Sequence, residues 1–202
     1  MEQVRLCVLV SGSGTILEAM IESGLDVALV ASDRPCRGLD VARSSGIEAL
    51  LVDRADFGGF SPQFDRTGYS VALANELATR DIDLVAMAGF GTIMTGEFHA
   101  AYPGRVLNTH PSLLPQFKGW HAVRQAIEAG AGETGCTVHV ATEELDAGPI
   151  LAQQRVAVLA SDDEATLHER IKEVERTLYP RVVRGVVDAL HEGREPGDVS
   201  FA

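Results

Sequence analysis

The sequence predicts one α/β domain in which helices flank a mostly parallel sheet, with an antiparallel hairpin toward the C-terminal end. Three observations lead to this prediction. Short apolar runs alternate with segments of helical periodicity along the first half of the chain. Each run is apolar at consecutive positions, as in strands that are buried on both faces of a parallel sheet. Glycines and turn residues follow several of the runs, and this order of elements predicts a Rossmann-like arrangement.

The composition is that of an ordinary globular protein and excludes several classes. The chain has 202 residues, of which 46% are hydrophobic and 23% charged, so we expect a single domain over residues 1–202. We find no apolar run long enough to cross a bilayer and no signal peptide, which favours a cytoplasmic location. The net charge of −12 disfavours binding to nucleic acid or to an anionic membrane. The three cysteines are widely spaced and predict reduced thiols, and no histidine has metal-ligand spacing, so no metal is expected.

The first apolar run, residues 5–10, leads into a glycine loop and then a helical pattern. Such a loop directs free N–H groups and the helix dipole at an anion. Gly12 and Gly14 fit the start of a dinucleotide fingerprint, but Leu17 stands where its third glycine would be, so a single phosphate fits better. A plain tight turn is the alternative. The candidate donors are the amides of Gly14, Thr15 and Ile16.

The later elements follow from the same patterns. Apolar runs predict strands at 26–32, 48–52, 84–88, 105–107, 136–141 and 150–158. Helical periodicity predicts helices at 38–44, 64–79, 121–129 and 162–178, the last interrupted near Pro180 and continuing toward His191. The strands at 136–141 and 150–158 flank an acidic turn and are expected to pair as the antiparallel hairpin. The segment 192–202 is polar and is expected to be a flexible tail.

The stretch from Gly104 to Gly119 carries the clearest chemical signal. Asn108 and His110 are two residues apart, which puts their side chains on one side of an extended segment. An amide donor can stabilise an oxyanion, and an imidazole can move a proton near neutral pH. The alternative for either residue alone is an ordinary turn or core position.

Asp146 lies in the acidic turn together with Gly148, which we expect to allow an unusual backbone path. If the hairpin folds back on the sheet edge, the carboxylate reaches His110 and favours its protonated form. No serine or cysteine stands in a recognisable nucleophile context, so acyl transfer between two bound molecules fits best. Of the other histidines, we expect His121 to cap a helix, His139 to be a core residue, and three to lie on the surface: His99, His168 and His191.

Several motifs between about Arg5 and Pro180 resemble those of the phosphoribosylglycinamide formyltransferase family. They are Asn108-Thr-His110-Pro-Ser-Leu-Leu-Pro115, Gly119, Thr137-Val-His139, Asp146-x-Gly148-Pro149 and Leu178-Tyr-Pro180. The resemblance implies transfer of the formyl group from 10-formyltetrahydrofolate, the cosubstrate, to the amine of glycinamide ribonucleotide in purine biosynthesis. It also implies that Asn108, His110 and Asp146 are catalytic, with His110 as the general acid.

The resemblance further implies two binding regions and leaves a homodimer open. Glycinamide ribonucleotide would contact Gly14, Thr15, Ile16, Lys172 and Glu175, with Glu175 on the ribose hydroxyls. Folate would contact Arg66, Gly91, Thr92, Ile93, Met94, Asn108, Thr142, Glu143, Glu144, Leu145 and Asp146. Phosphate binding would thus belong to about residues 1–104, and catalysis and folate binding to about residues 105–190.

Two positions depart from the family pattern. The family usually has Asn where this chain has Ile16, and a cationic Lys172 could offset that loss. The family also usually has Met-Arg where this chain has Gly91 and Thr92, so folate contacts there would have to use the backbone.

Three other functions compete with this interpretation. A 10-formyltetrahydrofolate hydrolase resembles the chain but tends to have a second His where Pro111 stands, and it carries an extra regulatory domain. A methionyl-tRNA formyltransferase adds a tRNA-binding domain, for which we see no room. A non-catalytic nucleotide-binding module would need only the glycine loop and would leave Asn108, His110 and Asp146 unexplained.

Overall fold

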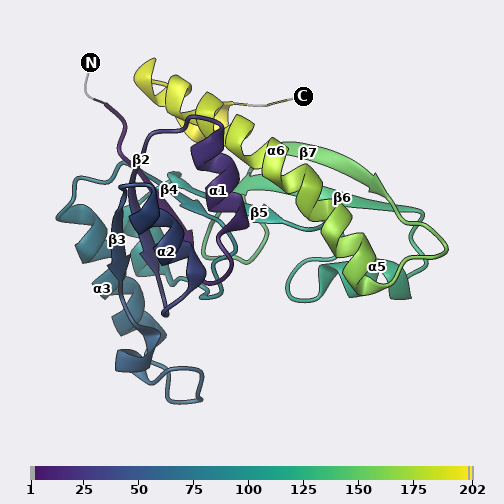
Figure 1. Ribbon diagram of the computed structural model, residues 1–202, viewed down its shortest axis with the longest axis horizontal. Helices are drawn as coiled ribbons and strands as arrows, with labels where there is room; N and C mark the ends of the chain where they lie inside the picture. Colours follow the sequence, from purple (N-terminus) through teal and green to yellow (C-terminus); the bar gives the residue numbers. More distant parts are fainter. Residues whose placement is uncertain (1–2, 200, 202) are drawn as a thin grey trace.

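The computed structural model describes residues 3–199 and 201 of the chain, and these residues form a sheet with helices on both faces (Figure 1). The described residues contribute seven strands: β1 (Leu6–Val10), β2 (Val27–Ser32), β3 (Glu48–Leu51), β4 (Leu84–Met87), β5 (Val106–His110), β6 (Glu133–Val140) and β7 (Ile150–Ala157). They lie in the order β3-β2-β1-β4-β5-β6-β7. The strands from β3 to β5 are parallel, whereas β6 is antiparallel to β5 and β7 antiparallel to β6. The predicted fold class, including the antiparallel hairpin, is confirmed.

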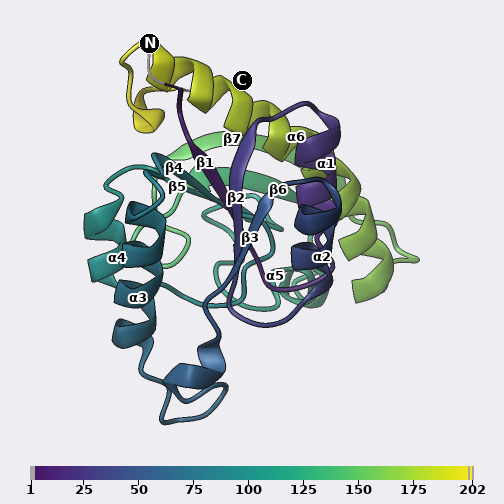
Figure 2. The same cartoon turned by 60° about the vertical axis from the view of Figure 1, so that its left-hand side comes forward.

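The helices divide between the two faces, as Figure 2 shows for α1 and α2 on one side and α3 and α4 on the other. Their bounds are α1 (Thr15–Glu22), α2 (Arg37–Ser44), α3 (Arg66–Ala78), α4 (Gly96–Ala101), α5 (Ala122–Glu128) and α6 (Glu164–His191), with 3₁₀ turns η1 (Arg54–Phe57) and η2 (Pro196–Asp198). Successive side chains of β1 point to opposite faces, so Val8 packs with α1, α2 and α6, while Leu9 packs with α3 and α4. The sheet therefore separates two apolar layers. The helix α4 was not predicted from the sequence.

The C-terminal helix corrects one expectation. We expected an interruption near Pro180, but α6 is continuous over 28 residues with Pro180 inside it. A proline inside a helix removes one hydrogen bond and costs about 3 kcal/mol. Burial of Leu178, Tyr179 and Val182 on the same stretch offsets that cost, because this stretch packs on the sheet.

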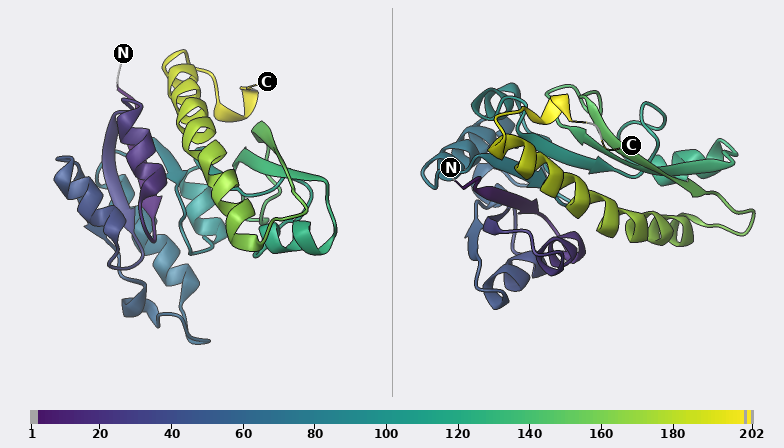
Figure 3. Two further views of the ribbon diagram at one scale, coloured as in Figure 1. Left: turned by 45° about the vertical axis from the view of Figure 1, so that its right-hand side comes forward. Right: turned by 90° about the horizontal axis from the view of Figure 1, so that it is seen from above.

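α6 runs across β5, β6 and β7, as the left panel of Figure 3 shows. The segment that follows it also contacts the domain, since the Phe201 amide donates to the Leu151 carbonyl at 2.8 Å and the Phe201 ring packs beside Gly185. All three cysteines are free thiols. None of the helices among residues 3–199 is long and apolar enough to cross a membrane.

Candidate active site

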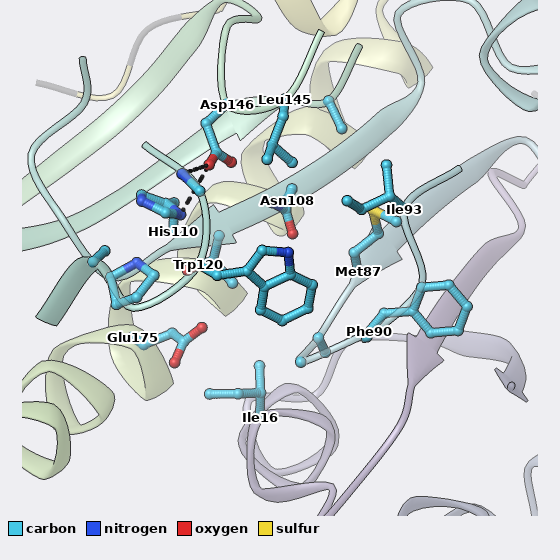
Figure 4. A pocket seen from close by; sticks show the side chains of 18 of the residues that line it. Ile16, Met87, Phe90, Ile93, Asn108, His110, Trp120, Leu145, Asp146 and Glu175 are labelled. Carbon is cyan, nitrogen blue, oxygen red and sulfur yellow. Dashed lines mark hydrogen bonds and ion pairs between the residues drawn. The ribbon is translucent and has the colours of Figure 1, made fainter. Parts of the chain in front are cut away.

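A cavity of about 550 Å³ opens at the carboxyl ends of the parallel strands (Figure 4). The chain runs from β1 outward to β2 and β3, then returns to place β4 on the other side of β1. The loops that follow β1 and β4 therefore leave in opposite directions, which creates a crevice at this point of an open α/β sheet. Residues from the glycine loop, the loop after β4, the end of β5, the turn after β6 and α6 line the cavity.

The register between β5 and β6 determines the polar centre of the cavity. β5 continues past the predicted residue 107 to His110, so Asn108 and His110 both lie on the strand and face one side. Asn108 pairs with His139 across the two strands, and the Asn108 Nδ2 atom lies 3.3 Å from the His139 Nε2 atom. The expected proximity of Asn108 and His110 is therefore confirmed, and His139 joins them.

Asp146 reaches this centre from the turn after β6. Its Oδ2 atom lies 3.4 Å from the His110 Nδ1 atom, and its Oδ1 atom lies 3.7 Å from the His139 Nε2 atom. The same Oδ2 atom accepts a hydrogen bond from the Gly119 amide at 2.8 Å. Asp146 itself adopts a left-handed φ of 52°, and a Cβ atom on Gly148 would lie 1.8 Å from the Val140 carbonyl oxygen. Gly148 is thus required for a close backbone approach rather than for a left-handed conformation.

Both ring nitrogens of His110 have partners in the protein. The Nε2 atom lies 2.8 Å from the Phe117 carbonyl oxygen, and the Nδ1 atom faces the Asp146 carboxylate. Both ring nitrogens therefore face acceptors, and these contacts orient the ring next to the cavity.

His139 is neutral in the same cluster and fixes the amide of Asn108. Burial lowers the pKa of His139, the charge of His110 lowers it further, and Asp146 opposes this only in part. The His139 Nδ1 atom lies 3.0 Å from the Val140 carbonyl, so it carries the proton and leaves Nε2 as the acceptor for Asn108. The second N–H of the Asn108 amide remains available to a ligand. His139 is buried, as predicted, but it also belongs to the polar cluster.

The glycine loop forms the opposite end of the cavity. Gly14 is the N-cap of α1 with φ 73°, and no side chain caps the helix. The amides of Gly14, Thr15 and Ile16 donate to no other described residue, so they remain open to an anion. The Ile16 side chain is buried and offers no polar atom there.

Two side chains of α6 complete this end. Lys172 and Glu175 both line the cavity, and the Lys172 Nζ atom lies 3.6 Å from an oxygen of Glu169. Burial raises the pKa of Glu175, while the Thr109 hydroxyl and the charge of Lys172 oppose the rise. A carboxyl group that can accept hydrogen bonds from a ligand, Glu175, and a cation, Lys172, thus lie beside the glycine loop.

The loop after β4 offers its backbone rather than the side chain of Thr92. The Thr92 hydroxyl donates to buried Asp33 at 2.7 Å, and Arg34 binds the same carboxylate through two hydrogen bonds of 2.9 and 3.0 Å. Burial alone would raise the pKa of Asp33, but the donors Arg34 and Thr92 bring it below its ordinary value. The amides of Thr92, Ile93 and Met94 donate to no other residue in the described part of the chain. Backbone contacts are therefore possible where the family arginine is missing.

Most of the predicted site residues line one cavity, but two do not. Gly91, Thr92, Ile93 and Met94 line it, as do Thr142, Glu143 and Leu145. Arg66, at the start of α3, and Glu144, whose side chain is exposed and faces Lys118, lie outside the cavity wall.

Sequence reasoning missed several lining residues. His99 and His168 were expected on the surface, but both are partly buried and line the cavity, and burial lowers the pKa of each. His121 is the N-cap residue of α5, but its side chain makes no cap hydrogen bond. Trp120 also lines the cavity, and its position directly after Gly119 was the available signal. No group of three or more residues in the described part of the chain could hold a metal ion.

The comparisons with known proteins identify a family for the chain. A family model described as formyl transferase matches residues 4–183. The chain is 42% identical to a phosphoribosylglycinamide formyltransferase of Mycobacterium tuberculosis, over 89% of this chain and 83% of that protein. It is 37% identical to the trifunctional purine biosynthetic protein adenosine-3 of Gallus gallus. That match covers 98% of this chain, but the chain spans only 20% of that protein's length.

A solved structure gives the same result. The fold superposes on a glycinamide ribonucleotide transformylase from Symbiobacterium toebii with a TM-score of 0.84 and 40% identity, covering 93% of this chain and 89% of that one.

Proposed function

The chain belongs to the phosphoribosylglycinamide formyltransferase family, and from this premise we propose that it transfers the formyl group of 10-formyltetrahydrofolate to the amine of glycinamide ribonucleotide. The observation that carries the proposal is the polar centre, in which Asp146 lies 3.4 Å from His110 and Asn108 keeps one amide N–H for a ligand. These groups suit an acyl transfer step in purine biosynthesis.

The reaction proceeds through a tetrahedral intermediate. The substrate amine attacks the formyl carbon, and the carbonyl oxygen gains the negative charge. The free N–H of Asn108 stabilises that oxyanion, and the His110 ring lies next to it. The bond from the formyl carbon to N10 then breaks, N10 takes a proton, and the amine loses one. Asp146 orients the His110 ring, and His110 acts as the general acid.

The glycine-loop end of the cavity binds glycinamide ribonucleotide. The open amides of Gly14, Thr15 and Ile16 bind its phosphate at the N-terminus of α1, and Glu175 accepts hydrogen bonds from the ribose hydroxyls. Lys172 offsets the side-chain contact that Ile16 cannot make. The Lys172→Ala variant is expected to raise the KM for glycinamide ribonucleotide, and an unchanged KM would remove this role.

The folate lies along the opposite wall, between the loop residues 91–94 and the turn 142–146. Its ring system contacts the backbone of the first loop, and Arg66 and Glu144, which lie outside the cavity wall, would meet its exposed tail. The enzyme uses formyl-folate as a cosubstrate, and the expectation that it needs no metal stays a prediction. A cytoplasmic location stays a prediction, as does the division near residue 104, and a homodimer stays open.

A simple assay tests the proposal against its nearest rival. Formation of tetrahydrofolate from 10-formyltetrahydrofolate is followed by absorbance with and without glycinamide ribonucleotide. A formyltransferase turns over only when the amine is present. Turnover that is equally fast without the amine would assign the chain to the hydrolases instead. Binding of a nucleotide without any turnover would favour the non-catalytic module.

A further inference from the structure

Trp120 is the only tryptophan of the chain, and it lies in the cavity. Its side chain is 64% exposed, although it belongs to the cavity wall. Figure 4 shows the indole in the middle of the cavity, with Asn108 on one side, Ile16 on another and Phe90 on a third. A large exposed apolar surface inside a cavity indicates contact with a ligand.

The backbone around Trp120 is fixed, whereas its ring is not held by polar contacts. The preceding Gly119 amide donates to Asp146 at 2.8 Å, and the Trp120 carbonyl accepts from the Gln125 side chain at 2.8 Å. The indole N–H donates to no other residue in the part of the chain that the structure describes. Gly119 and His121 both have left-handed φ values, 79° and 64°. A left-handed conformation at the non-glycine His121 is uncommon and costly, and such strain concentrates at functional sites.

The polar centre cannot by itself choose the nucleophile. Asn108 and His110 polarise the formyl carbonyl in the same way whether an amine or a water molecule attacks it. In transfer, the amine nitrogen bonds to the formyl carbon and the bond to N10 breaks. In hydrolysis, a water oxygen forms the new bond, the same bond to N10 breaks, one water proton goes to N10 and the other is released to solvent, which leaves formate and tetrahydrofolate. Selection of the amine therefore requires a group that occupies the space of water.

We propose that the indole of Trp120 covers the formyl group during transfer and excludes water, so that Trp120 determines the choice between transfer and hydrolysis. The inference rests on the proposed function. Asn108 and His110 stand on β5, whereas Trp120 stands on the loop between β5 and α5, and Figure 4 shows the indole beside Asn108. The inference places the reacting carbon between the strand and the indole. Since the Gly119 amide binds Asp146, this loop is positioned by the same carboxylate that orients His110.

The test measures how the formyl group is divided between its two products. Parent, Trp120→Ala and Trp120→Phe are assayed with saturating glycinamide ribonucleotide, and formate is measured per tetrahydrofolate formed. We expect the Trp120→Ala variant to raise this ratio about tenfold, because exclusion of water is what prevents the side reaction. Trp120→Phe keeps an aromatic cover and is expected to stay near the parent. Leu159→Ala removes another exposed apolar side chain outside the cavity wall and serves as the matched control.

A loss of transfer in Trp120→Ala without a higher share of formate would overturn the inference, because a residue that only positions substrate predicts that outcome. An equal rise in Leu159→Ala would also overturn it. A parent enzyme that formylates no amine would refute the proposed function together with the inference, whereas a parent that transfers normally isolates the result for Trp120.

A second measurement does not depend on a substitution. Labelling with 5-fluorotryptophan gives a single ¹⁹F signal, because Trp120 is the only tryptophan. The change of this signal between H₂O and D₂O reports exposure of the ring. We expect that change to shrink when glycinamide ribonucleotide and tetrahydrofolate are both bound. A ring that stays equally exposed in that complex would contradict the inference.

Discussion

The two ends of the cavity are built differently. At the end that contains the polar centre, which we call the acyl end, buried side chains from β5, from β6 and from the turn after β6 contact one another. Asp146 contacts both His110 and His139 there. At the glycine-loop end, backbone amides face the cavity and Ile16 contributes only apolar surface. The side chain at position 16 can therefore be exchanged with little loss, whereas each exchange at the acyl end removes a contact of several partners.

The sharpest test of this contrast removes a side chain from the acyl end. We expect His110→Ala and Asp146→Ala each to lower kcat by about 10²- to 10⁴-fold, because each removes general acid catalysis or oxyanion stabilisation. Steady-state kinetics measure the effect, and circular dichroism shows whether the fold survives. Near-parent turnover in either variant would refute the assignment of these residues.

The backbone that carries Asp146 gives the next largest effect. In Gly148→Ala the new methyl group would lie 1.8 Å from the Val140 carbonyl oxygen, so the turn must move. Overpacking of this kind costs about 1–3 kcal/mol, and we expect a kcat loss of about tenfold or more as Asp146 moves away from His110. Gly132→Ala is the matched control, since no atom lies within 4 Å of its added Cβ. Equal behaviour of the two variants would show that the turn tolerates the shift.

The glycine loop supplies a pair of variants that differ in backbone conformation and in the space around the added Cβ. Gly14 has φ 73°, and its added Cβ would lie 2.8 Å from the Gly38 Cα atom, whereas no atom lies near that of Gly12. We expect Gly14→Ala to cost about 1–2 kcal/mol of folding free energy and to raise the KM for glycinamide ribonucleotide. Gly12→Ala should stay within about 0.5 kcal/mol of the parent. Denaturant unfolding and substrate titration decide, and a Gly12 effect as large as that of Gly14 would contradict a role for backbone geometry.

The smallest expected effect concerns pH and Glu175. Burial raises the pKa of Glu175 in the folded protein, so the folded state binds its proton more tightly than the unfolded chain does. Stability contributed by this group is present below the ordinary glutamate pKa and is lost as pH rises through the raised value. Glu175→Gln removes the loss, so we expect a variant that is more stable than the parent near neutral pH.

The urea midpoint measured against pH tests this expectation. The gain of Glu175→Gln should shrink as pH falls toward the ordinary value for glutamate. Glu173→Gln, an exposed position on the same helix, is the control and should show no such trend. A gain that is independent of pH would point to packing instead of charge.

Much of this fold could be predicted because parallel strands are continuous apolar runs, as in residues 5–10 and 84–88. The end of β5 escaped prediction, since Asn108 to His110 are polar and become a strand only by pairing with β6. The continuity of α6 through Pro180 also depends on packing that no local pattern carries.

The site likewise has residues that local patterns predict and residues that only tertiary packing brings together. The period of a strand predicts that Asn108 and His110 face one side, and the acidic turn of the predicted hairpin, together with the resemblance to the family, adds Asp146. The path of the loop from β5 to α5, the direction of α6 and the placement of α4 bring Trp120, His168 and His99, respectively, to the cavity, and all three are tertiary properties. For Thr92, the decisive partner is Asp33, which lies 59 positions earlier in the chain.

The Oδ2 atom of Asp146 has two partners of different kinds, a backbone amide of the loop before α5 and the ring of His110. Linkage between these partners is reciprocal: whatever changes the charge on this carboxylate also changes how tightly the loop is tethered. Conversely, a ligand that presses the loop onto the sheet also strengthens the contact between Asp146 and His110. The position of the loop before α5 and the orientation of the His110 ring are thus coupled through one carboxylate.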